Sequence, residues 1–131
     1  MDCLFCSIIA GDIPCRQVAS DDVAIAFLDV NPAQDGHTLV VPRVHVPDVL
    51  ANDGQLAAVA PLVTTVARTL VDRLDADGVN LLVNSGEVAG QSVGHLHVHV
   101  IPRYAREPGV AGIRTRLPLR DQDEVLGQLV G

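Results

Sequence analysis

The chain has 131 residues, a length that predicts one domain with a single core. Hydrophobic residues make up 48% and charged residues 19%, which excludes a largely disordered protein. The formal charge of -7, with nine scattered basic residues that are all arginine, argues against a nucleic-acid partner. No apolar run reaches the roughly 20 residues of a membrane helix, and no basic secretory segment precedes the first apolar stretch. We therefore expect a cytoplasmic protein without membrane contact.

The first 42 residues predict three short strands after an apolar N-terminal segment that ends at Gly11. Apolar runs bounded by polar turns mark the strands, which we place at Gln17 to Ala19, Val23 to Asp29 and His37 to Pro42. The last two are separated by NPAQDG, a turn-forming sequence at 31–36. Such short connections favour antiparallel pairing.

The pattern then changes to the period of an amphipathic helix. Apolar residues recur at steps of three and four from Asp53, a plausible N-cap, onward: Leu56, Val59, Val63, Val66, Leu70 and Leu74. Pro61 lies inside this stretch and lacks an amide hydrogen, so the helix is expected to kink there or to begin later.

The remaining elements are a strand at Val79 to Asn84, a glycine-rich loop, and a second strand that contains three histidines and ends at Pro102. Residues 103–120 show no clear period, and residues 121–130 favour a short helix.

The sequence GHLHVHVIPR at 94–103 alternates polar and apolar residues, as a strand with one face on a core does. His95, His97 and His99 therefore share a face. Apolar or β-branched residues would make the better strand, so three aligned imidazoles suggest a function. A metal-binding cluster and a merely polar strand face are the alternatives.

The loop from Asn84 to Gly94 directly precedes these histidines. Backbone amides freed by its glycines can point at an anion, and Asn84, Gln91 and Ser92 add side-chain donors. His97, at the loop's exit, is then a candidate general base or nucleophile toward a phosphate. A nucleophilic ring must be neutral, with its tautomer fixed by a hydrogen bond to the other nitrogen.

Cys3 and Cys6 are spaced so that both thiolates can bind one tetrahedral zinc ion, with His45 and His95 as candidates for the other two ligands. A buried or redox-active pair is the alternative interpretation. Cys15 is expected to fill a small apolar space.

These segments, in this order, resemble the histidine triad family of nucleotide-binding hydrolases and transferases. The resemblance rests on CLFCSIIAGDIP, FLDVNPAQDGHTLVVPRVH, NSGEVAGQSVG and HLHVHVIPR, and it extends from Cys3 to Arg103. It implies a single domain over 1–131, with a core at about 3–104 and a tail at 105–131. Two departures are Leu28, where some relatives have a polar residue, and the region after Tyr104, which matches no family feature.

The resemblance implies an enzyme that acts at the α-phosphate of a purine nucleoside phosphoramidate, adenylate or related conjugate. His97 would be the nucleophile, His99 would contact the phosphate, and His37 would support the nucleophile from a neighbouring strand, with Ser92 beside them. Asp29 would accept from the ribose hydroxyls. The remaining expected nucleotide contacts are apolar walls at Phe5, Ile8, Phe27 and Val30, and loop contacts at Asn84, Gly90, Gln91 and Ser92.

The resemblance also implies a structural Zn²⁺ held by Cys3, Cys6, His45 and His95. The implied fold is α+β: an antiparallel sheet of about five strands, one long helix on one face and a short N-terminal helix. A homodimer with a continuous sheet is expected. Two alternatives stay open: a zinc metallohydrolase that uses His95, His97 and His99 as ligands, and a non-catalytic nucleotide-binding signalling module.

Overall fold

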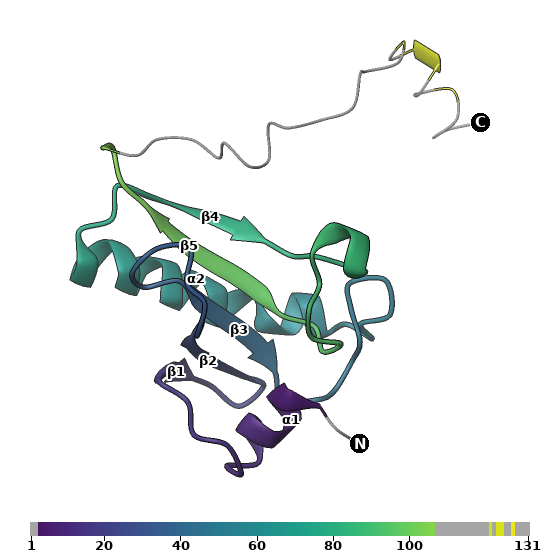
Figure 1. The fold of residues 1–131 in the computed structure, drawn as a ribbon, viewed down its shortest axis with the longest axis horizontal. Coiled ribbons are helices and arrows are strands. Elements are labelled where there is room, and N and C mark those ends of the chain that lie inside the picture. The colour runs from purple at the N-terminus through teal and green to yellow at the C-terminus, as the bar shows by residue number, and fades with distance from the viewer. Residues whose placement is uncertain (1–2, 107–120, 122, 125–126, 128–131) are drawn as a thin grey trace.

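The structure is a computed structural model that describes residues 3–106, 121, 123–124 and 127. In chain order its elements are α1 (Leu4–Ile9), β1 (Gln17–Ser20), β2 (Ala24–Leu28), β3 (Thr38–Pro42), α2 (Gln55–Leu74), β4 (Gly78–Leu82), the 3₁₀ turn η1 (Glu87–Ala89) and β5 (Val98–Arg103). Figure 1 shows α2 along the sheet, α1 beside the end of β3, and β1 and β4 at the two sheet edges.

The five strands form one antiparallel sheet in the order β1-β2-β3-β5-β4, which confirms the α+β fold expected from the sequence. β5 therefore lies between β3 and β4, although 55 residues separate β3 from β5 in the chain. In this register Leu39 is opposite His99 and Thr38 is opposite Val100.

Each face of the sheet has its own apolar core. The face toward α2 packs Ala24, Ala26, Val40, Val98 and Val100 against the buried side of that helix. The opposite face packs Ile25, Phe27, Leu39 and Val41 against Cys3 and Phe5 from the N-terminal segment. The strict alternation along β2 and β3 thus covers both faces, with α2 on one and α1 on the other.

The start of α2 differs from the prediction. Asp53 is not the N-cap; the helix begins at Gln55 after Gly54, which has a left-handed φ of 78°. Asn52 provides a cap instead, because its Oδ1 accepts from the backbone N–H of Leu56 at 3.2 Å. Pro61 stays inside the 20-residue helix, on its exposed side.

The histidine segment also differs in its bounds. The strand begins at Val98, so His95 and His97 precede it, and Pro102 lies inside it instead of ending it. Pro102 is tolerated because β3 pairs with β5 only as far as Val100, which leaves β4 as the single neighbour of β5 at that position.

Cys15 is exposed, so its predicted role as a buried filler is wrong. It lies in the connection between α1 and β1, where no apolar core needs filling. Most of the helix expected over 121–130 lies outside the described residues. Within the described part of the chain, no helix combines the length and apolar character needed to cross a bilayer.

Candidate active site and metal centre

The site lies on the sheet face opposite α2, where the pairing of β3 with β5 brings distant histidines together. Because Leu39 is opposite His99, His37 is a diagonal neighbour of His99 on the same face. The rings of His37 and His99 are 5.1 Å apart between centroids, and those of His97 and His99 are 5.0 Å apart. His37 and His97 are each only 5% exposed, so both rings are held within the protein.

His97 is held by the backbone of its own segment. Its Nδ1 lies 2.7 Å from the carbonyl oxygen of His95, and a carbonyl can only accept, so Nδ1 carries the proton. In the neutral ring the lone pair is therefore on Nε2. This is the tautomer that a nucleophilic imidazole attacking through Nε2 needs.

His37 and His99 form a hydrogen-bonded chain with a fixed direction. The backbone N–H of Ala33 donates to Nδ1 of His37 at 2.9 Å, which puts the proton of the neutral His37 ring on Nε2. That Nε2–H donates to Nδ1 of His99 at 2.9 Å. The proton of neutral His99 is then on Nε2, a buried atom without a hydrogen-bond partner among the described residues.

Burial keeps these rings neutral. Desolvation, followed by repulsion from His97 and His37, lowers the pKa of His99 from 6.5 to about 4, although Asp29 opposes the shift. The pKa of His37 is lowered too, mainly by desolvation, and Asp29 again acts in the opposite direction. The carboxylate Oδ2 of Asp29 lies 3.5 Å from Nε2 of His37. At neutral pH the chain from Ala33 to His99 is thus a chain of neutral donors and acceptors.

A second cluster combines the thiols of Cys3 and Cys6 with the imidazoles of His45 and His95. Sγ of Cys6 is 3.3 Å from Nδ1 of His45 and 3.6 Å from Nδ1 of His95, and the two Nδ1 atoms are 3.1 Å apart. Sγ of Cys3 is 3.5 Å from Nδ1 of His95. Tetrahedral zinc with such ligands requires about 3.6 Å between sulfur and nitrogen and about 3.3 Å between nitrogens. The four donors are therefore spaced for one tetrahedral ion.

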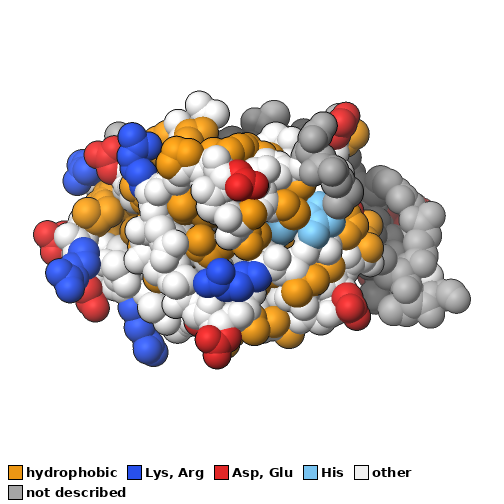
Figure 2. All heavy atoms as spheres, turned by 90° about the horizontal axis from the view of Figure 1, so that it is seen from below, with side chains coloured by type: hydrophobic (Ala, Val, Ile, Leu, Met, Phe, Trp, Pro, Cys, Tyr) orange, Lys and Arg blue, Asp and Glu red, His pale blue; other side chains and the backbone are white. Residues whose placement is uncertain are grey.

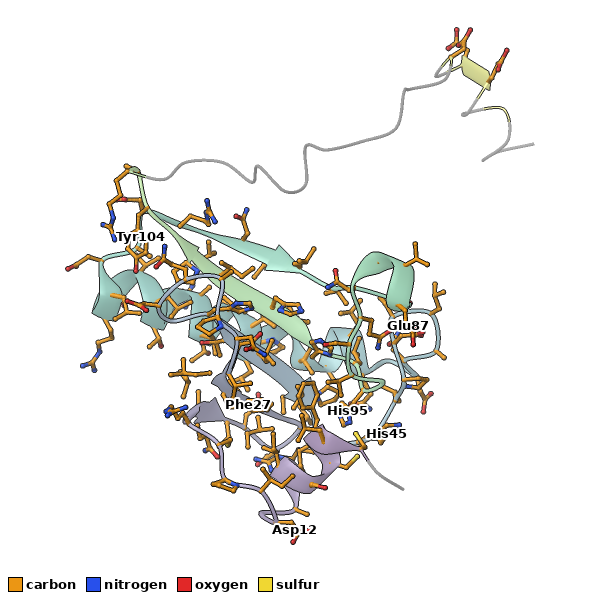
Figure 3. The ribbon with its side chains drawn as sticks, in the orientation of Figure 1. Asp12, Phe27, His45, Glu87, His95 and Tyr104 are labelled. Atoms are coloured by element: carbon orange, nitrogen blue, oxygen red, sulfur yellow. The ribbon has the colours of Figure 1, made fainter. Side chains whose placement is uncertain are left out.

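The outer contacts of His95 fit the same conclusion. Its Nε2–H donates to the carbonyl of Pro42 at 2.9 Å, which leaves the Nδ1 lone pair facing the two sulfurs. Metal-binding histidines commonly have their other nitrogen fixed in this way. Figure 3 shows His45 and His95 side by side at the start of the N-terminal helix.

The trio Asp29, His37 and His99 also has ligand atoms within 4.8 Å of one another, but its hydrogen bonds do not suit a metal. The nitrogen of His37 that faces the trio carries a proton, because the amide of Ala33 occupies the other one. At His95 the opposite holds, because the proton is on the nitrogen that faces away from the cluster and the lone pair faces the two sulfurs. Nor do His95, His97 and His99 form a group whose ligand atoms come this close together among the described residues.

The side chain of Gln91 holds the glycine-rich loop together and connects it to the segment after β3. The Oε1 of Gln91 accepts from the N–H of Gly86, and its Nε2 donates to the carbonyls of Pro47 and Val93. Its donors are thus used within the protein. Gly90 has a φ of 98° and is packed so that an added Cβ would lie 3.3 Å from Nδ2 of Asn84. Ser92 is exposed, and its hydroxyl is accessible from solvent.

The apolar residues expected to line a base pocket fall into two groups. Phe5 and Phe27 are 4% and 3% exposed, and their rings meet edge to face at 5.4 Å. Ile8 is partly buried in the same cluster, whereas Val30 is 79% exposed. In Figure 2 histidine atoms reach the surface among hydrophobic side chains.

A cavity of about 550 Å³ is lined by β1, by the segment 28–37 and by the C-terminal half of α2. Its lining includes Val18 and Leu70, and also Asp29, Val30 and His37 of the expected nucleotide site. His97 and His99 are not among its lining residues.

Sequence reasoning missed the backbone groups that set the tautomers: the Ala33 amide and the Pro42 carbonyl. Neither has a sequence signal, since every residue except proline carries both an amide and a carbonyl. Only the strand register and the turn at 31–36 bring them to the rings.

The comparisons with known proteins agree with this geometry. The HIT domain matches residues 10–106. The adenosine 5'-monophosphoramidase of Schizosaccharomyces pombe is 38% identical over 111 residues, which cover 84% of this chain and 80% of that protein. An adenylylsulfatase of Arabidopsis thaliana is 39% identical over 107 residues, which cover 81% of this chain and 54% of that protein.

Among solved structures, a zinc-bound histidine triad family protein from Mycobacterium smegmatis is 34% identical, with a TM-score of 0.79. The match covers 98% of this chain and 96% of that one. Sequence and structure thus agree over the whole histidine-bearing sheet, and the chain belongs to the HIT domain family.

Proposed function

We propose that this protein is a hydrolase or transferase that acts at the α-phosphate of purine nucleoside phosphoramidates, adenylates or related conjugates. The observation that carries the proposal is the fixed tautomer of His97, whose Nδ1–H is bonded to the His95 carbonyl at 2.7 Å. This leaves the Nε2 lone pair for a bond to phosphorus. The activities of the Schizosaccharomyces pombe and Arabidopsis thaliana relatives, an adenosine 5'-monophosphoramidase and an adenylylsulfatase, support this substrate class.

The reaction has two displacements at phosphorus. In the first, Nε2 of His97 bonds to the α-phosphorus, and the bond to the leaving group breaks with its electrons on that group. The carbonyl of His95 stabilises the positive charge that the ring then carries. In the second, water attacks the phosphorus and the phosphorus–nitrogen bond breaks. The net products are the nucleoside monophosphate and the protonated leaving group; an acceptor other than water makes the reaction a transfer.

His99 and His37 act on the developing negative charge of the phosphate. The Nε2–H of His99, which has no hydrogen-bond partner within the described part of the chain, is the donor that we assign to a phosphate oxygen, and His37 fixes its direction through Nδ1. A preorganised donor of this kind costs no reorganisation during the reaction. Ser92, exposed on the loop, is assigned to the same oxygens or to the leaving group.

The nucleoside is assigned to Asp29 and the apolar residues around it. The carboxylate of Asp29 accepts from the N–H of Asn31 and has capacity left for the ribose hydroxyls. A purine placed against Val30 would bury the exposed apolar surface of that residue. The expected further walls are Ile8, Phe5 and Phe27. Asn84, Gly90 and Gln91 shape the loop beside the phosphate.

We further propose a structural Zn²⁺ on Cys3, Cys6, His45 and His95. The donor set and its spacing support zinc, and so does the zinc in the mycobacterial relative. The four ligands fill a closed tetrahedral site, so the ion contributes stability and no chemistry. It would fix α1, a helix of six residues that is too short to be stable alone.

A homodimer with a continuous sheet is proposed on the family resemblance. β4 is the sheet edge that such a dimer would extend, and Leu81 on it is 57% exposed. Light scattering at micromolar concentration should give twice the chain mass; a monomer mass would contradict the proposal.

The test is His97→Ala, assayed for zinc content, nucleoside monophosphate affinity and turnover of adenosine and guanosine phosphoramidates, adenylates and dinucleoside polyphosphates. We expect turnover to fall by several orders of magnitude, with zinc retained and affinity only modestly weaker. A metallohydrolase that binds its metal through His97 would lose metal together with activity. If His97→Ala turned over substrate at the parent rate, both the covalent mechanism and the metallohydrolase would be refuted. If the parent protein bound nucleotide tightly but turned over substrate only at the background rate, a binding module would be favoured.

A further inference from the structure

Phe5 joins the metal cluster to the histidine that we assign as nucleophile. Its ring meets the ring of His97 at 5.1 Å and 87°, and the ring of His95 at 5.9 Å and 72°. The ring of Phe27 supports it from behind at 5.4 Å. Phe5 lies in α1, between Cys3, which is the N-cap of that helix, and Cys6 within it, so one short segment supplies two thiols and this ring.

The low exposure of Phe5 points to a task beyond the wall of the base pocket that is expected of it. Only 4% of the residue is exposed, whereas Val30, another expected wall, is 79% exposed. Its ring contacts the rings of Phe27, His95 and His97 and is buried in the apolar cluster on this face of the sheet. Contact with a purine would therefore use only a small part of the ring.

His97 needs a second restraint that Phe5 is placed to give. The hydrogen bond from Nδ1 to the His95 carbonyl restrains one side of the ring, but it tolerates small rotations about the side-chain torsions χ1 and χ2, which move Nε2. An edge-to-face contact at 87° limits this rotation, because tilting the imidazole brings it into the phenyl ring. Aromatic pairs of this geometry are favourable beyond the area that they bury.

We propose that Phe5 is a positioning residue that holds the imidazole of His97 in line with the phosphorus. The proposal rests on the function proposed above. Misplacing a reacting atom by about 1 Å can cost about 100-fold in rate, so a looser ring lowers the chemical step much more than substrate binding.

The test is Phe5→Leu in the zinc-loaded protein, with Ile25→Ala as the matched control. Ile25 is buried in the same core cluster, on β2. We expect Phe5→Leu to lower kcat about 10- to 100-fold, with KM changed less than about threefold and zinc retained. The control should be destabilised with kcat near that of the parent.

Raised KM with an unchanged kcat would overturn the proposal and leave Phe5 as a base wall. An equal fall of kcat in Ile25→Ala would also overturn it, because general loosening would then explain both. If Phe5→Leu does not fold, Phe5→Met replaces it, and NMR of the His97 ring supplies a readout without substrate. We expect one sharp set of ring signals in the parent and broadened or doubled signals in the variant; unchanged signals would contradict the restraint. Failure of the proposed function would be seen separately, as absence of turnover in the parent.

Discussion

Acidification should destabilise the protein through His99, and His99→Gln should remove part of this effect. The pKa of His99 is lowered to about 4 in the folded protein, from 6.5 in the unfolded chain. Below pH 6.5, His99 therefore binds a proton in the unfolded chain but stays neutral in the folded protein until the pH approaches 4. Stability is fully kept above pH 6.5 and is lost as the pH falls toward 4. The groups that face this ring are His97, His37 and Asp29.

The two pKa values set the size of the effect. Between pH 7 and pH 5 a pKa difference of this size corresponds to roughly 2 kcal/mol of unfolding free energy. The ring is only partly buried, and its titration is shared with two other histidines, so we expect about 1 kcal/mol from His99 itself. Glutamine does not titrate, and its side-chain oxygen can still accept from Nε2 of His37.

Urea unfolding of both zinc-saturated proteins at pH 7 and pH 5 measures the effect. The free energy of unfolding should fall by about 1 kcal/mol more in the parent than in His99→Gln over this range. Comparing the losses cancels the contributions of the other histidines. The same loss in both proteins would show that His99 is not held neutral by its surroundings, and the chain from Ala33 to His99 would then lack its basis.

Three further substitutions test the metal site and the close packing at Gly36. Cys3→Ser and Cys6→Ser should each lose zinc and melt at a lower temperature, while Cys15→Ser, at an exposed position, should keep both zinc content and melting temperature; full zinc in the first two variants would contradict the metal site. Gly36→Ala should destabilise the protein by about 2–4 kcal/mol, because left-handed backbone and a steric clash both oppose a Cβ at this position. The φ of Gly36 is 94°, and the new Cβ would lie 2.5 Å from Cδ1 of Leu74. Gly54 also has a left-handed φ, of 78°, but a Cβ there would meet open space. Gly54→Ala should therefore lower the free energy of unfolding only by the cost of the strained backbone. Equal losses for the two variants in urea unfolding would argue against the clash.

The sequence predicted the elements well because period-two and period-3.6 patterns follow directly from one-sided burial. Ala24 to Leu28 and Thr38 to Pro42 alternate between two cores, and the helix over Gln55–Leu74 has one apolar stripe. Their ends were less predictable. Asp53 was a reasonable cap by residue type, but the turn before α2 brings Asn52 into the capping position instead.

The candidate site was predictable only where a role depends on residue type and spacing. The spacing of Cys3 and Cys6 identifies a candidate zinc pair with His45 and His95 as candidate partners, and the structure brings the four ligand atoms together. The roles of Ala33 and Pro42 could not be predicted, since only their backbone atoms act. The contact of Phe5 with His97 depends on how α1 packs on the sheet, and no local pattern encodes it.

The central claim is that His97 attacks phosphorus, and the stereochemical course of the reaction tests it most directly. A nucleoside phosphoramidate made chiral at phosphorus by oxygen isotopes and sulfur is hydrolysed by the zinc-loaded protein, and the configuration of the product is determined by phosphorus NMR. Two in-line displacements, one by Nε2 of His97 and one by water, each invert the phosphorus. The account therefore predicts net retention of configuration. Net inversion would mean a single direct attack by water and would contradict the covalent role of His97.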